Sequence, residues 1–236
     1  MEIIYEDREL VVCHKMSGVP VQTADIRQQD MVSILKNYLV AKKEKAEIFV
    51  VHRLDQPVEG VIVFAKTKRA ASVLSCQIQK NNMKKYYLAL VEGKFTTSVG
   101  VLEDYLVRDG KSNISKVVPK STRGAKAAKL FYKVKQEVIG PEKIAEVIGN
   151  NKSSAQLQQI SLVSVRLETG RHHQIRVQMA HAGHPLIGDK KYNPNCSITY
   201  MPVGLCANEI SFSHPITGKE IKFVITPKGE LFQKFI

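Results

Sequence analysis

The chain has 236 residues, 44% of them apolar, and a formal net charge of +13. This apolar content excludes a disordered chain and suffices for one large domain or for two tightly joined lobes with a shared core. The sequence does not open with a basic region followed by a long apolar one, and no apolar run is long enough to cross a bilayer, so we expect neither a signal peptide nor a membrane partner.

Strands and helices alternate along the first third of the chain, where apolar residues recur at alternating or helical spacing. In chain order we expect a strand pair about an acidic turn at 2–15, a one-sided helix at 30–46, two short apolar strands at 48–51 and 61–66, and a second helix at 68–81. Thr67 is placed to cap that second helix. The motif "HRLD", with His52, Arg53 and Asp55, lies between the two short strands, where the chain leaves a core and side chains meet ligands.

The rest of the chain is predicted to be richer in strands than in helices. The expected elements are strands at 84–93, 128–138 and 160–170, a helix at 171–183 that Gly183 ends, and a hairpin at 205–226 turned by "HPITGK". Residues 138–159 show no clear period and are interpreted as an inserted segment. Because strands outnumber helices and are often joined by hairpins, we expect a mixed α+β fold rather than a doubly wound sheet.

The positive charge of the chain is concentrated in one segment. Between Arg108 and Lys135, nine basic residues accompany a single acid, Asp109. Such a run is commonly a solvated surface, and that interpretation stays open. The alternative is a surface for a polyanion, because the glycines, serines and proline of residues 108–124 predict a mobile loop able to follow a phosphate backbone. No lipid-facing amphipathic helix accompanies the segment, so nucleic acid is favoured over a membrane.

Two groups of polar residues are candidates for chemistry, "HRLD" and "TGRHHQIR". On a helix, His172 and Arg176 of the second motif lie four residues apart on one cationic edge, with His173 beside them. A cationic edge that faces an aspartate can form a forked ion pair, which orients the carboxylate and keeps it ionised. A purely structural salt bridge is the commoner outcome for such residues.

Neither the histidines nor the cysteines predict a metal site. No acidic or cysteine ligand lies at a recognised spacing from the histidines His172, His173, His181 and His184, and the motif H-E-x-x-H is absent. No C-x-x-C pair occurs among the four cysteines, Cys13, Cys76, Cys196 and Cys206. This pattern also argues against a disulfide framework and favours a reducing cytoplasm.

The order of the motifs along nearly the whole chain is specific. They are "HRLD", "AK" ten residues beyond the aspartate, "KKYYLALVEG", "ETGRHHQIRVQMAHAGHPLIGDKKY" and "LCANEISFSHPITG". In this order they resemble the RluA-type pseudouridine synthase family. The opening, "IIYEDRELVVCHKMSGVP", looks like the start of the family's catalytic domain, with "CHKMSG" in place of the usual lysine and proline pair. The resemblance implies a single catalytic domain over residues 1–236, with no separate N-terminal RNA-binding domain.

The resemblance also implies the fold and the reaction. The fold would be the pseudouridine synthase core, a bent, mixed and mainly antiparallel sheet in two lobes with RNA crossing a central cleft. The reaction would be the isomerisation of uridine to pseudouridine in structured RNA, either transfer or ribosomal, without a cofactor or a metal. The base must detach, turn over and reattach through a ring carbon while it remains caged, which calls for a carboxylate near the sugar and the base. A cytoplasmic monomer without an obligate protein partner is expected.

Individual residues match the family's functional positions. Asp55 matches the catalytic aspartate, Arg176 the arginine that pairs with it, and Tyr87 the tyrosine that stacks on the target base. Arg53 matches the position near the gap left by the extruded nucleotide. His52 is either a structural hydrogen-bonding residue or an RNA contact. The remaining expected RNA contacts are Arg171, Lys116, Lys120, Arg123 and Lys126.

The chain departs from the family pattern directly after the aspartate. Gln56, Val58 and Glu59 replace the more usual arginine, threonine and serine, which does not touch Asp55, Tyr87 or Arg176. Two functions of other classes stay open. One is a non-catalytic RNA-binding protein on the same scaffold, and the other is an RNA glycosidase with Glu59 as a second carboxylate.

Overall fold

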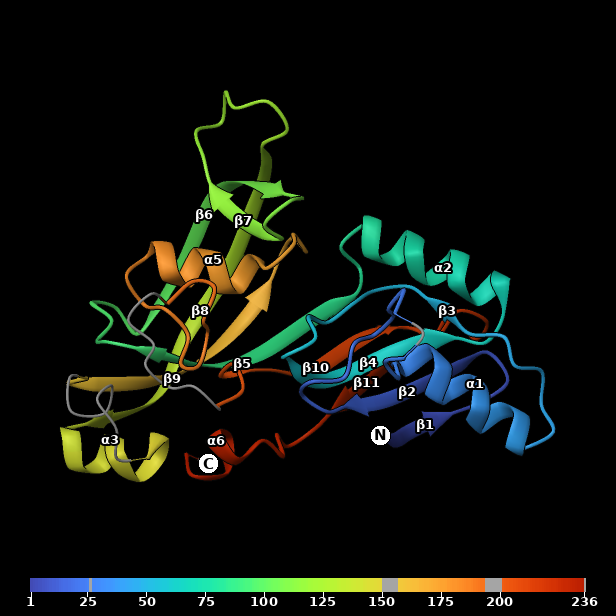
Figure 1. Ribbon diagram of the computed structural model, residues 1–236. Helices are drawn as coiled ribbons and strands as arrows, with labels where there is room; N and C mark the ends of the chain where they lie inside the picture. The colour runs from blue at the N-terminus through green and yellow to red at the C-terminus, as the bar shows by residue number, and fades with distance from the viewer. Residues whose placement is uncertain (26, 150–156, 194–200, 236) are drawn as a thin grey trace. The chain divides into compact units, whose positions relative to one another are not determined.

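The computed structural model describes residues 1–25, 27–149, 157–193 and 201–235 (Figure 1). The chain forms two compact units, the first built from residues 1–85 and 207–227 and the second from residues 86–206 and 228–236. Two strands, β5 (Lys84–Glu92) and β10 (Leu205–Ser213), continue along the chain from one unit into the other. Cys196 and residues 150–156 of the expected insertion lie outside the described residues.

The first unit is a sheet with two helices. Its strands follow the order β1-β2-β4-β10, with β3 on β4 and β11 on β10. The pairs β1–β2, β2–β4, β3–β4 and β10–β11 are antiparallel. The bounds are β1 (Glu2–Glu6), β2 (Leu10–Lys15), α1 (Met31–Ala41), β3 (Phe49–Val50), β4 (Glu59–Ala65), α2 (Lys68–Gln79) and β11 (Glu220–Val224).

Alternating apolar residues form the core of the first unit. Val12 of β2 and Val63 of β4 are buried in one cluster with Leu74 of α2, so α2 covers this face of the sheet. Every residue of β2 and β4 is buried, which means that the opposite face is covered as well. The hydroxyl of Thr67 accepts a hydrogen bond of 3.1 Å from the Ala70 amide, which confirms the predicted cap of α2.

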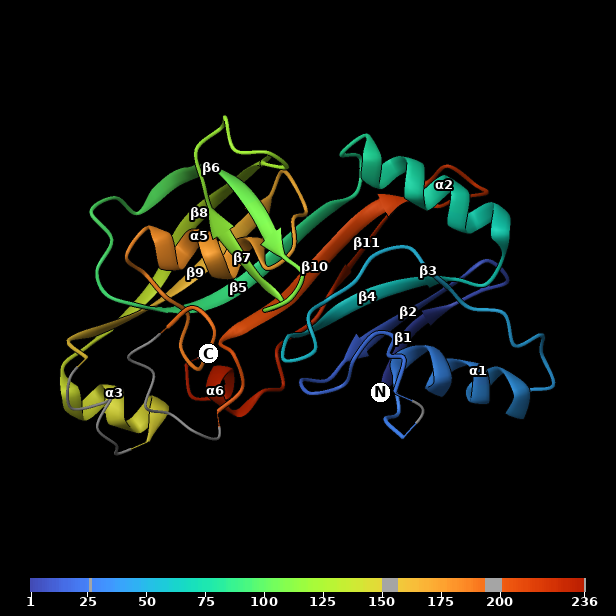
Figure 2. The ribbon, with the colours of Figure 1, turned by 45° about the horizontal axis from the view of Figure 1, so that its top comes forward.

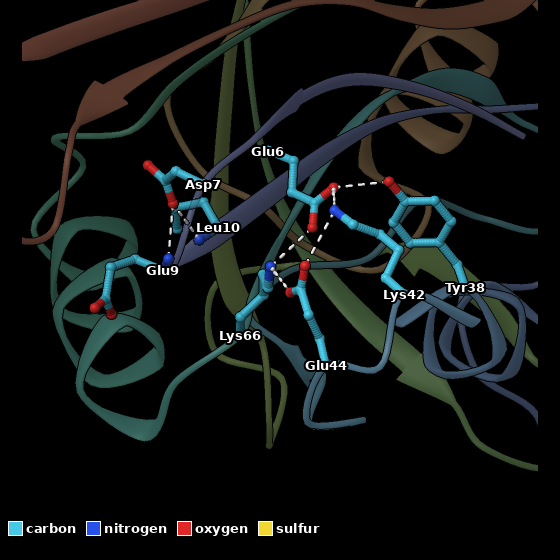
Figure 3. Close-up of polar contacts among 8 residues, drawn as sticks. All are labelled: Glu6, Asp7, Glu9, Leu10, Tyr38, Lys42, Glu44 and Lys66. Carbon is cyan, nitrogen blue, oxygen red and sulfur yellow. Dashed lines mark hydrogen bonds and ion pairs between the residues drawn. The ribbon is translucent and has the colours of Figure 1, made fainter. Parts of the chain in front are cut away.

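A network of charged side chains joins the end of β1 to the end of α1 and to the residue after β4 (Figure 3). The Glu6 carboxylate accepts hydrogen bonds from the Tyr38 hydroxyl at 2.8 Å and from the Lys42 ammonium at 2.9 Å. The Lys66 ammonium, just after β4, donates to Glu6 and to Glu44, each at 2.8 Å. Burial alone raises the pKa of Glu6, but the hydrogen bonds from Lys66, Lys42 and Tyr38 outweigh it and lower that pKa to about 2.

The second unit is built on strands in the order β5-β9-β8-β6-β7. The pairs β9–β8, β8–β6 and β6–β7 are antiparallel. Figure 2 shows α5 alongside β6, β7 and β8, and Val177 of α5 is buried against Leu106 of β6 and Ala128 of β8. The bounds are β6 (Val99–Asp109), β7 (Ile114–Val117), β8 (Lys126–Ile139), α3 (Pro141–Ile148), β9 (Gln159–Leu167), α5 (Gln174–His181) and α6 (Glu230–Gln233).

Most of the predicted elements are confirmed, and so is the mixed α+β class with antiparallel pairing. The helix expected at 30–46 ends at Ala41, where the chain becomes lysine-rich and Lys43 adopts a positive φ of 60°. The inserted segment contains an unpredicted helix, α3, with Pro141 in its first turn and Gly149 directly after its end. These residues are ordinary start and stop signals, and Ile144, Val147 and Ile148 form its buried stripe.

Two further expectations are corrected. The segment 108–124 is not one loop, because Ile114–Val117 forms β7 and pairs with β6 through partners such as Arg108 and Ser115. The Asp109 carboxylate accepts the Lys111 amide at 2.9 Å and so shapes the turn between these strands. The helix expected from residue 171 begins at Gln174, because His173 adopts a left-handed φ of 53°.

Candidate active site

The turn that carries Asp55 is held tightly within the first unit. Asp55 is half-buried, and its carbonyl accepts the Val58 amide at 3.0 Å. The ammonium of Lys15, which is fully buried, donates to the carbonyl of Gln56 at 3.0 Å and to that of Val19 at 2.7 Å. Burial lowers the pKa of Lys15 to about 8, against the opposing effect of the Asp55 and Glu59 carboxylates. The backbone directly after Asp55 is therefore fixed from inside the unit.

Two of the residues that depart from the family pattern make contacts within the protein. The side-chain amide of Gln56 donates to the Gly18 carbonyl at 3.1 Å, which joins the Asp55 turn to the segment after β2. Glu59 is buried, and its Oε1 lies 2.7 Å from Nε2 of the buried His14. Glu59 thus supports the fold beside the turn, which weighs against its use as the second carboxylate of a glycosidase.

His52 and Arg53 differ in their environment although they are neighbours. Nε2 of His52 accepts the Val63 amide of β4 at 3.2 Å, and burial lowers the pKa of His52 to about 3, so the ring is neutral at physiological pH. This geometry favours the structural role for His52. Arg53 is exposed and donates to the Gln22 side chain at 2.8 Å. Arg53 and Gln22 both line an open pocket of about 560 Å³.

Tyr87 and Arg176 belong to the second unit. Tyr87 lies in β5 and is 7% exposed, whereas its neighbour Tyr86 is half-buried, as expected for side chains that point to opposite faces of a strand. Arg176 lies in the first turn of α5 and is 3% exposed. The two residues share a unit with the basic segment, while Asp55 belongs to the other unit.

Arg176 is held by Asp189, for which the sequence predicted no role. The Nε and Nη2 atoms of Arg176 donate to the two carboxylate oxygens of Asp189, each at 2.7 Å, and Asp189 is fully buried. A bidentate pair of this kind fixes the plane of the guanidinium as well as its position. Asp189 lies near the end of the motif "ETGRHHQIRVQMAHAGHPLIGDKKY", but nothing in the spacing of that motif indicates that Asp189 pairs with Arg176.

The start of α5 is anchored by the side chain of Gln174, the first residue of the helix, rather than by a cationic edge. The Gln174 side chain accepts the Arg171 amide at 3.0 Å and the Thr169 hydroxyl at 2.8 Å, and it donates to the Lys129 carbonyl at 3.1 Å. His172 and His173 lie before the helix, so the expected alignment of His172 with Arg176 on one helical edge is wrong.

The basic segment exposes its charges along β7, the following turns and the start of β8. Arg171 is exposed nearby, and its Nε donates to the Ala127 carbonyl at 2.8 Å. The other exposed cations of this surface are Arg108, Lys111, Lys116, Lys120, Arg123 and Lys126. Such a surface is suited to phosphates, whose neutralisation by lysine and arginine dominates the affinity for nucleic acids.

Neither a metal-binding group nor a membrane-spanning helix is found in the described part of the chain. Among residues 1–25, 27–149, 157–193 and 201–235, no group of three or more histidines, cysteines or acids is placed to hold a metal ion. Within the same described part of the chain, no helix has the length and apolar character that crossing a membrane requires.

The sequence profile of the RNA pseudouridylate synthase family matches residues 9–181. The chain belongs to this family. It is 31% identical over 222 residues to uncharacterized RNA pseudouridine synthase YhcT of Bacillus subtilis (strain 168), covering 94% of this chain and 67% of that protein. It is 28% identical over 232 residues to tRNA pseudouridine synthase C of Yersinia pestis, covering 94% and 84%. It is also 28% identical over 241 residues to ribosomal large subunit pseudouridine synthase C of Buchnera aphidicola subsp. Schizaphis graminum (strain Sg), covering 99% and 69%.

A solved structure has the same fold as this pseudouridine synthase. Human RNA pseudouridylate synthase domain containing 4 superposes with a TM-score of 0.75 at 21% identity, covering 99% of this chain and 90% of that one. The expected pseudouridine synthase fold and the RluA-type membership are thus confirmed. As a member of this family, the chain is an isomerase that converts uridine to pseudouridine in RNA.

Proposed function

We propose that this pseudouridine synthase modifies specific uridines of transfer RNA or ribosomal RNA and that Asp55 is its catalytic carboxylate. The observation that carries the proposal is the family match over residues 9–181, which contains Asp55, Tyr87 and Arg176 together. The relatives named for transfer RNA and for ribosomal RNA are equally similar to the chain, at 28% identity each, so both substrate classes are included.

In the proposed reaction, four side chains have different roles. Asp55 supplies the carboxylate that acts while the base is detached, turned over and rejoined through a ring carbon. Arg176 pairs with Asp55, because a guanidinium directs a carboxylate and favours its ionised form. Tyr87 stacks on the target base, and Arg53 lies near the gap that the extruded nucleotide leaves.

RNA is proposed to bind along the basic surface of the second unit. The exposed Lys116, Lys120, Arg123 and Lys126, with Arg171, support this role because exposed cations contact phosphates without requiring a particular sequence. His52 is left out of the proposed contacts, since its ring hydrogen-bonds to the Val63 amide. We further propose that the two units act together as one catalytic domain, in a cytoplasmic monomer.

The pairing of Asp55 with Arg176 is tested by a double-mutant cycle on single-turnover rates. Arg176→Met should disable turnover nearly as fully as Asp55→Asn, and Arg176→Lys should be intermediate because an ammonium lacks the planar fork. The two losses should not add, because the arginine has no further catalytic role once the carboxylate is gone. Folded Arg176→Met protein that reacts at the parent rate would remove the pair from the mechanism.

The substrate class is tested by mapping pseudouridines in total RNA from cells with and without the protein. We expect particular transfer or ribosomal RNA positions to revert to uridine when the protein is absent. They should be restored by the parent gene and not by the Asp55→Asn gene. An unchanged map of both RNA classes would contradict the proposed substrates. The monomer is tested by light scattering, which should give a mass near 26.4 kDa.

A further inference from the structure

The segment from Asp189 to Tyr192 contacts Arg176 through two of its residues. The Asp189 carboxylate accepts two hydrogen bonds from the guanidinium, and the centroid of the Tyr192 ring lies 5.2 Å from the guanidinium carbon. A cation over an aromatic face is attracted by the ring's electron distribution. One short segment therefore sets both the plane and the position of the arginine that is proposed to orient the catalytic carboxylate.

The hydroxyl of Tyr192 joins this segment to β7 and to the start of α5. It accepts a hydrogen bond of 2.7 Å from the Ser115 amide of β7 and forms one of 2.8 Å with Nδ1 of His173. Ser115 is 2% exposed, and its own hydroxyl donates to the His172 carbonyl at 2.8 Å. Ser115 and His173 are buried and Tyr192 is half-buried, so these hydrogen bonds are partly shielded from water, which strengthens them.

The outer side of the same hairpin carries positive charge. We call residues 108–117 the basic hairpin, which comprises the end of β6, its turn and β7. Arg108 is the cross-strand partner of Ser115 and is exposed, as is Lys116, the residue after Ser115. At the turn, the Lys191 ammonium donates to the Asn113 carbonyl at 3.0 Å. The basic hairpin thus presents cations outward and is bonded on its inner side to the segment that holds Arg176.

We propose that Tyr192 is a positioning residue that couples RNA contact at the basic hairpin to the orientation of Arg176. The coupling rests on the proposed function, in which Arg176 serves catalysis and the hairpin cations contact phosphates. Phosphates that bind the hairpin pull on a backbone whose Ser115 amide is bonded to the Tyr192 hydroxyl. The ring, which has only two side-chain torsions, then passes the displacement to the guanidinium that it faces.

Tyr192→Phe is the direct test, because it removes the hydroxyl and keeps the ring against Arg176. We expect the single-turnover rate at saturating RNA to fall about tenfold, while the RNA affinity changes less than about twofold. Tyr132→Phe is the matched control, since it also deletes one hydrogen-bonding hydroxyl of the second unit, the one 3.1 Å from the Thr97 hydroxyl. The control should keep the parent rate. Equal rates for Tyr192→Phe and the parent would overturn the proposal.

Repeating the Tyr192→Phe substitution in the Arg176→Lys variant distinguishes an effect through Arg176 from a general loss of packing. In Arg176→Lys protein, which lacks the forked guanidinium, Tyr192→Phe should lower the rate by less than about twofold. A full tenfold loss in that background would show that Tyr192 acts elsewhere and would also overturn the proposal. Melting curves of all variants establish that the compared proteins are folded at the assay temperature.

A readout that does not need turnover distinguishes failure of the coupling from failure of the proposed function. The NMR signal of the Arg176 Nε–H is followed while a pool of transcribed, unmodified transfer RNAs is added at low salt, where a basic surface binds RNA of any sequence. We expect the signal to shift in the parent and to shift by less than half as much in Tyr192→Phe. Identical shifts in the two proteins would contradict the coupling, whereas a shifted signal without pseudouridine in any RNA would contradict only the proposed function.

Discussion

The guanidinium of Arg176 is held by both carboxylate oxygens of Asp189, each at 2.7 Å, and both side chains are buried. The plane of Arg176 is therefore defined by contacts within the second unit. A forked, buried pair leaves the arginine few alternative orientations, which suits a group that must direct a catalytic carboxylate. The relationship makes Asp189 a positioning residue for the proposed chemistry.

Asp189→Asn should lower the single-turnover rate at least about tenfold with RNA affinity within about twofold, because the amide keeps the shape but loses one acceptor and the charge. Asp189→Ala should in addition reduce the free energy of unfolding by about 3–5 kcal/mol, since it leaves a buried charge without that partner. Urea unfolding and single-turnover assays measure the two effects. Asp25→Asn is the control, because Asp25 pairs with Arg27 on the exposed surface of the first unit. Parent-like turnover of folded Asp189→Asn protein would show that the fork does not serve catalysis.

Salt dependence tests the basic surface as an RNA contact. In the variant in which glutamine replaces Lys116, Lys120, Arg123 and Lys126, the slope of log affinity against log salt concentration should become less steep by about 3. Each phosphate contact contributes about 0.7–0.9 to this slope. The matched control replaces four exposed lysines of the first unit, Lys36, Lys43, Lys45 and Lys80, with the same change in net charge. Equal slopes for the two quadruple variants would show that only net charge matters.

The Glu6 network should make the stability of the first unit depend on pH. The pKa of Glu6 is lowered from 4.5 to about 2 on folding, so its contribution is complete above about pH 4.5 and is lost as the pH falls toward 2. Glu6→Gln should therefore reduce the free energy of unfolding at pH 7 by about 2 kcal/mol after allowance for solvent screening, and by much less at pH 3. Urea titrations at several pH values measure the difference. Glu47→Gln, in an exposed pair with Lys45, is the control and should have little effect at either pH.

Sequence periodicity was sufficient for the elements whose apolar residues follow one pattern. The strands β1, β2 and β4 and the cap at Thr67 could be predicted, because burial and local hydrogen bonding decide them. Helix α3 was not predicted although Pro141 and Gly149 mark its ends, because its 8 residues are too few to show a helical period clearly. Strand β7 was missed because its pairing with β6 outweighs the turn-forming residues around it.

The site was predictable as far as motifs specify individual residues. Asp55, Tyr87 and Arg176 could be named from order and spacing, and the pairing of Asp55 with Arg176 stays a prediction. The fork from Asp189 and the contacts of Tyr192 depend on how the chain folds back after α5, which residue spacing does not encode. The contacts of Gln56 and Glu59 with the segment around β2 likewise depend on tertiary structure.

The central claim is that Asp55 drives an isomerisation, and product analysis of a single turnover tests it most directly. RNA reacted with excess enzyme is digested, and its nucleosides and any released base are separated and weighed by mass spectrometry. The parent should convert uridine to pseudouridine of equal mass without releasing uracil. Asp55→Asn should form no pseudouridine and should bind RNA within a few-fold of the parent, because it removes one carboxylate and little contact area. Free uracil as the main product, or pseudouridine formed by Asp55→Asn at the parent rate, would contradict the account.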